Sequence, residues 1–452
     1  MISDTIAAIA TSTAGTGAIS IIRVSGDEAI DIVNHLFKGK DLTMQHSHTI
    51  HYGHIACPET GTIIDEVLIM LMRGPRSFTT EDVVEINCHG GAFVTKRILE
   101  LLLTHGARHA HAGEFSKRAF LNGRVDLSEA EAIMDVIEAK SNHALELAVN
   151  SLDGRVTILI NGLREEILDI IANIEVNIDY PEYDDVKQMT NEILLPQAIA
   201  VHQQMAHLLQ TAKTGQLLKN GIKTAIIGRP NVGKSSLLNQ LMREEKAIVT
   251  DIAGTTRDTV EGFVNIGGLT LNLIDTAGIR KTDDLVEAIG VEKSKNLIEE
   301  AELILLVLDS SEALTDEDLV LLQLTENKNR LLLLNKSDLT QKVDTSKLPE
   351  HIETSMLEKS GVTHLENAIK SLFEINDIKS DETFVSNTRH IAKLNQSMTA
   401  IESAITHMQI DLPIDMVEID LKNAWAFLGE IIGEDVTDSL IDELFTKFCL
   451  GK

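Results

Sequence analysis

The sequence predicts a multidomain protein with an N-terminal α+β domain, a helical domain built from two chain segments, and an α/β domain inserted between those segments. The length of 452 residues allows roughly three domains at ~150 residues each. Strand-like and helix-like runs alternate over residues 221–376, as in a doubly wound sheet, and helical patterns flank that region on both sides. A Gly-rich loop pattern at Gly228–Ser235 separates the first strand-like run of this region from its first helix-like run.

The N-terminal region mixes short β-like runs with turns, for example at Ala18–Val24 and Asp82–Asn87. From Asp126 the pattern becomes helical, and Ser128-Glu129-Ala130-Glu131 has capping-box spacing. Apolar residues then recur at helical spacing through Val149, which predicts a long helix. The expected segments are residues 1–120 (α+β), 121–218 (helical, first part), 219–378 (α/β) and 379–452 (helical, second part).

The composition argues against several classes of protein, namely unaided nucleic-acid binders, disulfide-stabilised proteins and membrane proteins. The formal net charge is −29, from 40 basic and 69 acidic residues, which argues against tight, unaided binding of nucleic acid. Three cysteines make no disulfide framework. The longest apolar runs are too short to span a bilayer, and the Met1–Asp4 start has no signal-peptide character, so we expect a cytoplasmic protein without a membrane segment.

The loop at Gly228–Ser235 fits the phosphate-binding pattern G-x-x-x-x-G-K-[ST]. Its backbone N–H groups and the start of the following helix can hold phosphate oxygens. Lys234 is expected to reach the terminal phosphates, and the Ser235 hydroxyl to bind Mg²⁺. The expected nucleotide-binding residues here are Asn231, Val232, Gly233, Lys234, Ser235 and Ser236.

Four further segments follow in the order expected of a GTPase. Asp275-Thr276-Ala277-Gly278 comes after an apolar strand, where Asp275 can hold Mg²⁺ through water and Gly278 can face a γ-phosphate. Asn335-Lys336-Ser337-Asp338 ends another strand, and its aspartate can accept two hydrogen bonds from guanine. Ser355-Met356-Leu357 is expected to close over the base. The remaining segment is a predicted switch containing Thr250, Asp251, Ile252, Ala253, Gly254, Thr255 and Thr256, with Thr256 as a second Mg²⁺ ligand.

The water-orienting glutamine of many GTPases is absent, because Ile279 and Arg280 follow Gly278. The candidate catalytic groups are then the nearby acids Asp283, Asp284 and Glu287. Asn231 has two interpretations: it shapes the loop, or its amide oxygen holds a monovalent cation beside the phosphates, together with the carbonyls of Thr250, Ile252 and Thr255. The Gly254-Thr255-Thr256-Arg257-Asp258 run favours the cation.

Together these motifs resemble the MnmE (TrmE) family of tRNA-modification GTPases over essentially the full length. The motifs are G-R-P-N-V-G-K-S-S, V-T-D-I-A-G-T-T-R-D, D-T-A-G-I-R and N-K-S-D. The most specific addition is the end of the chain, Phe448-Cys449-Leu450-Gly451-Lys452, which is similar to that family's terminal F-C-I-G-K. Ser355-Met356-Leu357 departs from the commoner S-A-K/R form, which puts the base-closing contact there in doubt.

The resemblance implies a K⁺-dependent GTPase whose G domains pair transiently in a homodimer, with Glu287 activating water through a second, bridging water. It implies an N-terminal domain of the folate-binding type, with Arg23, Glu85, Arg124 and Lys452 at folate-contacting positions and 5-formyltetrahydrofolate or a related folate as ligand. It also implies a heterotetramer with an MnmG-type FAD protein, which adds carboxymethylaminomethyl to the wobble uridine of certain tRNAs. Cys449 matches a terminal cysteine linked to that modification.

An alternative is a regulatory GTPase of ribosome assembly, of the Era or Der type. Proteins of those types carry an RNA-binding appendix or a second G domain. This sequence has one phosphate-loop motif, no G-x-x-G in a basic C-terminal module, and a strongly acidic balance. These features favour the tRNA-modification interpretation.

Overall fold

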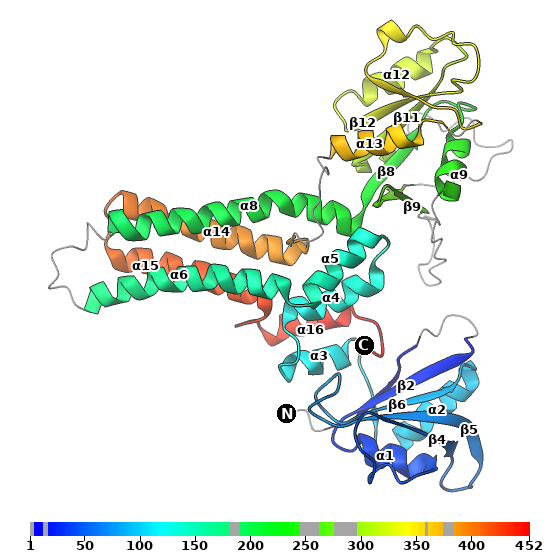
Figure 1. Cartoon of the computed structure of the whole chain (residues 1–452), viewed down its shortest axis with the longest axis vertical. Helices are drawn as coiled ribbons and strands as arrows, with labels where there is room; N and C mark the ends of the chain where they lie inside the picture. Colours follow the sequence, from blue (N-terminus) through cyan, green and yellow to red (C-terminus); the bar gives the residue numbers. More distant parts are fainter. Residues whose placement is uncertain are drawn as a thin grey trace. The chain divides into compact units, whose positions relative to one another are not determined.

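A computed structural model describes residues 4–11, 17–179, 190–244, 262–274, 296–357, 360–373 and 384–452 (Figure 1). The chain divides into two compact units. The first unit is Met1–Met134 with Leu428–Lys452, and the second is Asp135–Phe427. None of the helices within the described ranges is both long and apolar enough to cross a membrane.

The first unit is built on a seven-stranded sheet in the order β3-β4-β5-β6-β2-β1-β7. Neighbouring strands are antiparallel except β1 and β7, which are parallel. The strands are β1 (Ile6–Ile9), β2 (Ile19–Ser25), β3 (Phe37–Lys38), β4 (Thr49–Ala56), β5 (Ile63–Met72), β6 (Val83–His89) and β7 (Arg108–His109). The helices of this unit are α1 (Ala29–Leu36), α2 (Ala92–Thr104), α3 (Glu114–Leu121), the start of α4 (Leu127–Glu138), the end of α15 (Ile414–Ile432) and α16 (Asp438–Thr446).

Alternation along β2 separates the core face of this sheet from its other face. Ile22 and Val24 are fully buried in one cluster with apolar residues of α1 and α2. Arg23 lies between them in sequence and therefore points to the opposite face. The register places Arg23 directly across from Glu85 of β6. The sheet thus brings a cation and a carboxylate together on the face that α1 and α2 leave uncovered.

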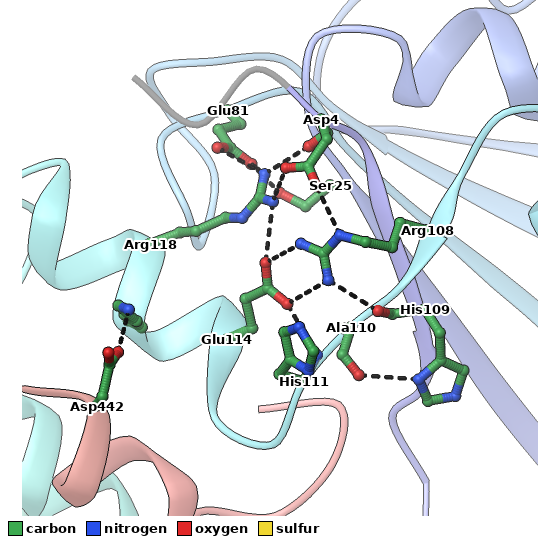
Figure 2. A network of polar contacts seen from close by, with 11 residues as sticks. Asp4, Ser25, Glu81, Arg108, His109, Ala110, His111, Glu114, Arg118 and Asp442 are labelled. Atoms are coloured by element: carbon green, nitrogen blue, oxygen red, sulfur yellow. Dashed lines mark hydrogen bonds and ion pairs between the residues drawn. The ribbon is translucent and has the colours of Figure 1, made fainter.

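A network of ion pairs around the buried Arg118 side chain connects separate segments of the first unit (Figure 2). The Arg118 side chain is 1% exposed, and it pairs with Asp4, Glu81 and Glu114 at 2.8–3.1 Å. Arg108 of β7 pairs with Asp4 and Glu114 as well. Because a buried guanidinium charge needs carboxylate partners, this network fixes the N-terminal strand, the loop before β6 and α3 relative to one another.

The helical start after Asp126 differs from the prediction in two ways. The Asp126 side chain accepts from the Glu129 N–H, and the Glu129 carboxylate accepts from the Asp126 N–H, both at 2.9 Å. This reciprocal cap replaces the one predicted at Ser128–Glu131, because the helix already begins at Leu127. The expected long helix is also interrupted, since Ser141 caps a new helix by accepting from the Ala144 N–H.

The second unit contains a bundle of long helices and a six-stranded sheet. The helices are the end of α4, α5 (Asn142–Leu152), α6 (Arg155–Asp179), η1 (Thr190–Leu194), α8 (Leu195–Asn220), α14 (Thr388–Gln409) and most of α15. Helices α8 and α14 pack side by side although the α/β region separates them in sequence (Figure 1). Helices from both sides of the α/β region therefore join in one bundle, but the ends of the two predicted helical segments, residues 121–134 and 428–452, belong to the first unit.

The six-stranded sheet has the order β13-β12-β11-β8-β10-β9, and only the β9–β10 pair is antiparallel. Its strands are β8 (Ile222–Ile227), β9 (Gly262–Ile266), β10 (Leu269–Leu273), β11 (Leu303–Asp309), β12 (Arg330–Asn335) and β13 (His351–Glu353). The other elements are α9 (Lys234–Glu244), α12 (Asp316–Leu324), η2 (Thr345–Lys347) and α13 (Val362–Leu372). The fully buried run of β11 is typical of a central parallel strand covered on both faces.

Candidate functional site: a phosphate loop and a base loop at one sheet edge

The loop between β8 and α9 lies against the ends of β11 and β12. Gly228 has φ +151°, and a Cβ atom there would come within 2.3 Å of the Val307 carbonyl oxygen. At Gly233, with φ +104°, a Cβ would lie 2.1 Å from the Asn335 amide nitrogen. Asn231 has φ +65°, a left-handed conformation that asparagine tolerates better than most residues. The glycines of the motif are therefore required by close packing and by backbone conformation.

Lys234, the first residue of α9, turns its amine back into the loop. Its Nζ donates to the carbonyl oxygens of Gly228 and Arg229, each at 2.7 Å. Burial lowers the pKa of the Lys234 amine below its usual value. The amine therefore lies at a helix N-terminus, where the phosphate oxygens of a bound nucleotide can replace the two loop carbonyls as its hydrogen-bond acceptors. Ser235 and Ser236 follow in the first turn of the helix, and Val232 is buried beneath the loop.

The loop Asn335–Asp338, called the base loop, forms the second half of this site, beside the phosphate loop Gly228–Ser235. The Asn335 side chain donates to the Val232 carbonyl at 2.8 Å, so the two loops are directly bonded. Asp338 is exposed, and one of its carboxylate oxygens accepts from the Ser355 hydroxyl at 2.6 Å. The Ser337 N–H donates to the Thr354 carbonyl at 3.1 Å. Because β8, β12 and β13 are parallel, their carboxyl ends place these groups along one edge of the sheet.

The segment predicted to close over the base lies beside the Asn335–Asp338 loop. Ser355 is buried, and its hydroxyl holds the Asp338 carboxylate. Met356 is half-buried, and Leu357 is 83% exposed. The predicted residues Thr250–Thr256, Asp275–Gly278 and Glu287 lie outside the described residues. The strand that leads to Asp275 lies beside β8, and the Ile274 N–H donates to the Thr224 carbonyl at 3.0 Å.

A second candidate site lies on the uncovered face of the first unit's sheet. A cavity of about 570 Å³ is lined by Arg23, Glu85 and Arg124, among others. The Arg23 Nε and Nη2 atoms donate to the same Glu85 oxygen at 2.9 and 2.8 Å. The Phe78 ring lies about 5 Å from both guanidinium groups, at 5.1 Å from Arg23 and 5.2 Å from Arg124. Phe78 was not predicted, because nothing in the sequence distinguishes a loop phenylalanine that reaches a pocket.

The C-terminal segment is docked on this same unit. The Cys449 carbonyl accepts from the Gly113 N–H at 3.3 Å, and the Lys452 carbonyl accepts from the Phe115 N–H at 3.2 Å. The Arg23 Nη1 atom donates to the Gly451 carbonyl at 3.3 Å. The Cys449 thiol is free and exposed. The structure thus brings Arg23, Glu85 and Arg124 to one cavity, and Lys452 follows directly after Gly451, the residue that Arg23 contacts.

The bonded phosphate and base loops at the edge of a largely parallel sheet define a guanine-nucleotide-binding protein of the P-loop GTPase class. Two family descriptions match the chain: "GTP-binding protein TrmE N-terminus" over residues 5–124 and "MnmE helical domain" over residues 127–449. The chain belongs to the MnmE (TrmE) family of tRNA modification GTPases, which confirms the resemblance seen in its motifs.

Curated relatives match the whole chain. The "tRNA modification GTPase MnmE" of Bacillus mycoides (strain KBAB4) is 55% identical, and that of Bacillus anthracis is 54% identical. Each alignment covers 99% of this chain and 99% of the relative. Among solved structures, the G domain of the FeoB iron transporter of T. maritima is 26% identical and has a TM-score of 0.24, with coverage of 33% of this chain and 98% of that domain.

Proposed function

We propose that this chain hydrolyses GTP to drive the addition of a carboxymethylaminomethyl group to C5 of the wobble uridine of certain tRNAs. The reaction would use a folate one-carbon unit and an MnmG-type FAD protein as partner. The observation that carries this proposal is the bonded pair of loops at Asn335 and Val232, on a chain that matches tRNA modification GTPases over its full length. Tandem mass spectrometry of tRNA nucleosides from a deletion strain should show the modified wobble uridine to be lost.

The phosphate loop offers ligands for both proposed metal ions. Mg²⁺ would be held by the Ser235 hydroxyl and by Thr256, and K⁺ by the Asn231 amide oxygen with the carbonyls of Thr250, Ile252 and Thr255. The left-handed backbone at Asn231 leaves its side chain exposed beside the loop, where a polar oxygen is available to a cation. A bound K⁺ would supply positive charge next to the phosphates, and Mg²⁺ would neutralise the charge that develops on them.

GTP turnover by the purified chain should be faster in K⁺ than in Na⁺ of equal ionic strength, by on the order of 100-fold, the scale of one preorganised electrostatic contact. Na⁺ is too small to span the same carbonyl oxygens. Phosphate release measured in the two salts tests this expectation, with Asn231→Ala as the variant that should lose the difference. Equal rates for the unmodified chain in both salts would rule out the cation.

The pocket at Arg23 has the chemistry that a reduced folate needs. A carboxylate such as Glu85 can accept paired N–H bonds from a pterin ring, while Arg124 can pair with the folate's glutamate carboxylates. The Phe78 ring offers an aromatic face for stacking. Cys449 and Lys452 belong to the terminal segment that Arg23 contacts through Gly451, which supports a role for the exposed Cys449 thiol beside the proposed one-carbon donor.

Arg23→Ala should weaken binding of 5-formyltetrahydrofolate by roughly 100-fold, because it removes a charged partner from Glu85 and from the terminal segment. Arg97→Ala is the matched control, since Arg97 is an exposed arginine on α2 that pairs with Glu100 of the same helix. Calorimetric titration of both variants measures the effect. Unchanged affinity in Arg23→Ala would remove this pocket from the proposal.

We propose that the two copies whose G domains pair also meet through a surface on the sheet of the first unit. On the face away from α1 and α2, Ile50 and Tyr52 are each 63% exposed and Leu68 is 46% exposed. Tyr52 and Leu68 are direct cross-strand neighbours. Two copies of a chain with a net charge of −29 repel each other broadly, so exposed apolar side chains are the favourable place for them to meet, even with the Glu66 carboxylate bonded to Tyr52 on the same face. Because tRNA is also negatively charged, we expect the partner protein to supply most of the basic side chains that contact it.

Tyr52→Glu should weaken the dimer by roughly 100-fold or more, because it buries an unpaired charge in the proposed interface. Phe93→Glu is the matched control: Phe93 is 82% exposed but lies on α2, on the opposite side of the sheet. Light scattering after size-exclusion chromatography gives the mass of each variant. A dimer that survives Tyr52→Glu as well as Phe93→Glu places the interface elsewhere.

A further inference from the structure

The segment Asp309–Asp318, between β11 and the first turn of α12, is bonded to both halves of the nucleotide site. Toward the base loop, the Asp309 carboxylate pairs with the Lys336 amine at 2.5 Å. Ser310 reinforces this contact, because its N–H donates to the Asn335 carbonyl at 2.9 Å and its hydroxyl donates to the Lys336 carbonyl at 2.8 Å. Three bonds thus join the first two residues of the segment to the base loop.

The other end of the segment is bonded to the phosphate loop. Arg229, the second residue of that loop, pairs with Glu312 at 2.5 Å and lies 3.3 Å from a carboxylate oxygen of Asp318. Asp318 is 2% exposed and is itself fixed by a capping box with Thr315 at the start of α12. The segment therefore runs from one nucleotide loop to the other, and each end is an ion pair that includes a buried carboxylate.

The surroundings of Asp309 stabilise the negative charge of its carboxylate. Its side chain is 3% exposed, and its second oxygen accepts from the N–H and hydroxyl of Ser311 at 2.9 and 2.6 Å. Burial raises the pKa of Asp309, but the hydrogen bonds from Lys336 and Ser311 outweigh it and hold the pKa below its usual value. Lys336 has φ +63°, a left-handed conformation that is unfavourable for lysine and that these contacts maintain.

We propose that Asp309 is a positioning residue for guanine recognition, which acts through Lys336 on the loop that ends in Asp338. The Asp318 end of the same segment positions the phosphate loop through Arg229. This inference rests on the proposed function, since it concerns the same nucleotide site. It assigns different consequences to the two ends: loss of Asp309 relaxes the choice of base, whereas loss of Asp318 weakens every nucleotide equally.

The test compares GDP with inosine diphosphate, which lacks the amino group that Asp338 would recognise. Calorimetric titration of the full chain should show tighter binding of GDP by the unmodified protein. In Asp309→Asn, which keeps the shape and removes the charge, GDP affinity should fall and its preference over inosine diphosphate should shrink roughly tenfold. In Asp318→Asn both affinities should fall by the same factor, so that the preference is kept.

Ser310→Ala provides a milder variant, because it removes only the hydroxyl bond to the Lys336 carbonyl, and it should reduce the preference in the same direction. Thermal unfolding of each variant checks that it is folded. A preference that is unchanged in both Asp309→Asn and Ser310→Ala overturns the inference while leaving the GTPase assignment intact. Failure of the unmodified chain to bind GDP overturns the proposed function itself.

Discussion

Asp338→Asn should lower GDP affinity by on the order of 10⁴-fold and should create affinity for xanthosine diphosphate. A carboxylate accepts two hydrogen bonds, from the guanine N1–H and from its amino group, and a site built for such bonds rejects analogues strongly. An asparagine amide still accepts from N1–H, but its NH₂ group faces the amino group of guanine. Xanthine has a carbonyl there, so the same amide donates to it. Fluorescence titration with the two nucleotides measures both changes.

Two features of the structure make this prediction specific. Asp338 is exposed, while Ser355 holds one of its oxygens at 2.6 Å, so the substitution changes the recognising group with little effect on the core. Asp344→Asn is the matched control, since Asp344 is another loop aspartate in the same unit and caps η2. Asp338→Asn with unchanged GDP affinity would show that the base is recognised elsewhere.

Glu287→Ala should bind GTP with nearly unchanged affinity and hydrolyse it about 100-fold or more slowly. The sequence places Ile279 where many GTPases have a water-orienting glutamine, and an aliphatic side chain can neither orient water nor accept a proton. Removal of a group that activates water costs about 10²–10⁴ in rate. Single-turnover phosphate release and nucleotide titration separate the chemical step from binding.

Asp283→Ala and Asp284→Ala are the matched variants for this experiment, because they remove the neighbouring acids that the sequence leaves as alternatives. Each should retain turnover within a few-fold of the unmodified chain. If one of them is as slow as expected for Glu287→Ala, and Glu287→Ala is active, the catalytic role moves to that residue.

Local patterns predicted the nucleotide loops well. The strand before Gly228, the helix that begins at Lys234 and the strand that ends in Asn335 are all present, because each is determined by a buried run next to a loop with special backbone needs. The helix after Asp126 was less predictable. Two capping patterns compete there, and only the structure shows that Asp126 pairs with Glu129. A single polar residue, Ser141, then interrupts an otherwise helical pattern.

The second site could not be predicted from local sequence patterns, because its residues are far apart in the sequence and meet only in the folded sheet. From local sequence alone Arg23 is an ordinary arginine on a strand and Glu85 an ordinary exposed position, and their ion pair depends on the register of strands 62 residues apart. Lys452 would be a frayed tail by the same reasoning, yet its carbonyl is bonded to the Phe115 N–H. The Asp309–Lys336 pair likewise joins two strand ends that only the sheet brings together.

The central claim is that guanine-nucleotide chemistry in this chain serves tRNA modification. The most direct measurement is mass spectrometry of tRNA nucleosides from a deletion strain that expresses either the unmodified chain or Asp338→Asn at equal levels. The account predicts that the unmodified chain restores the carboxymethylaminomethyl wobble uridine and that Asp338→Asn does not. Full modification in the deletion strain, or full restoration by Asp338→Asn, would contradict it.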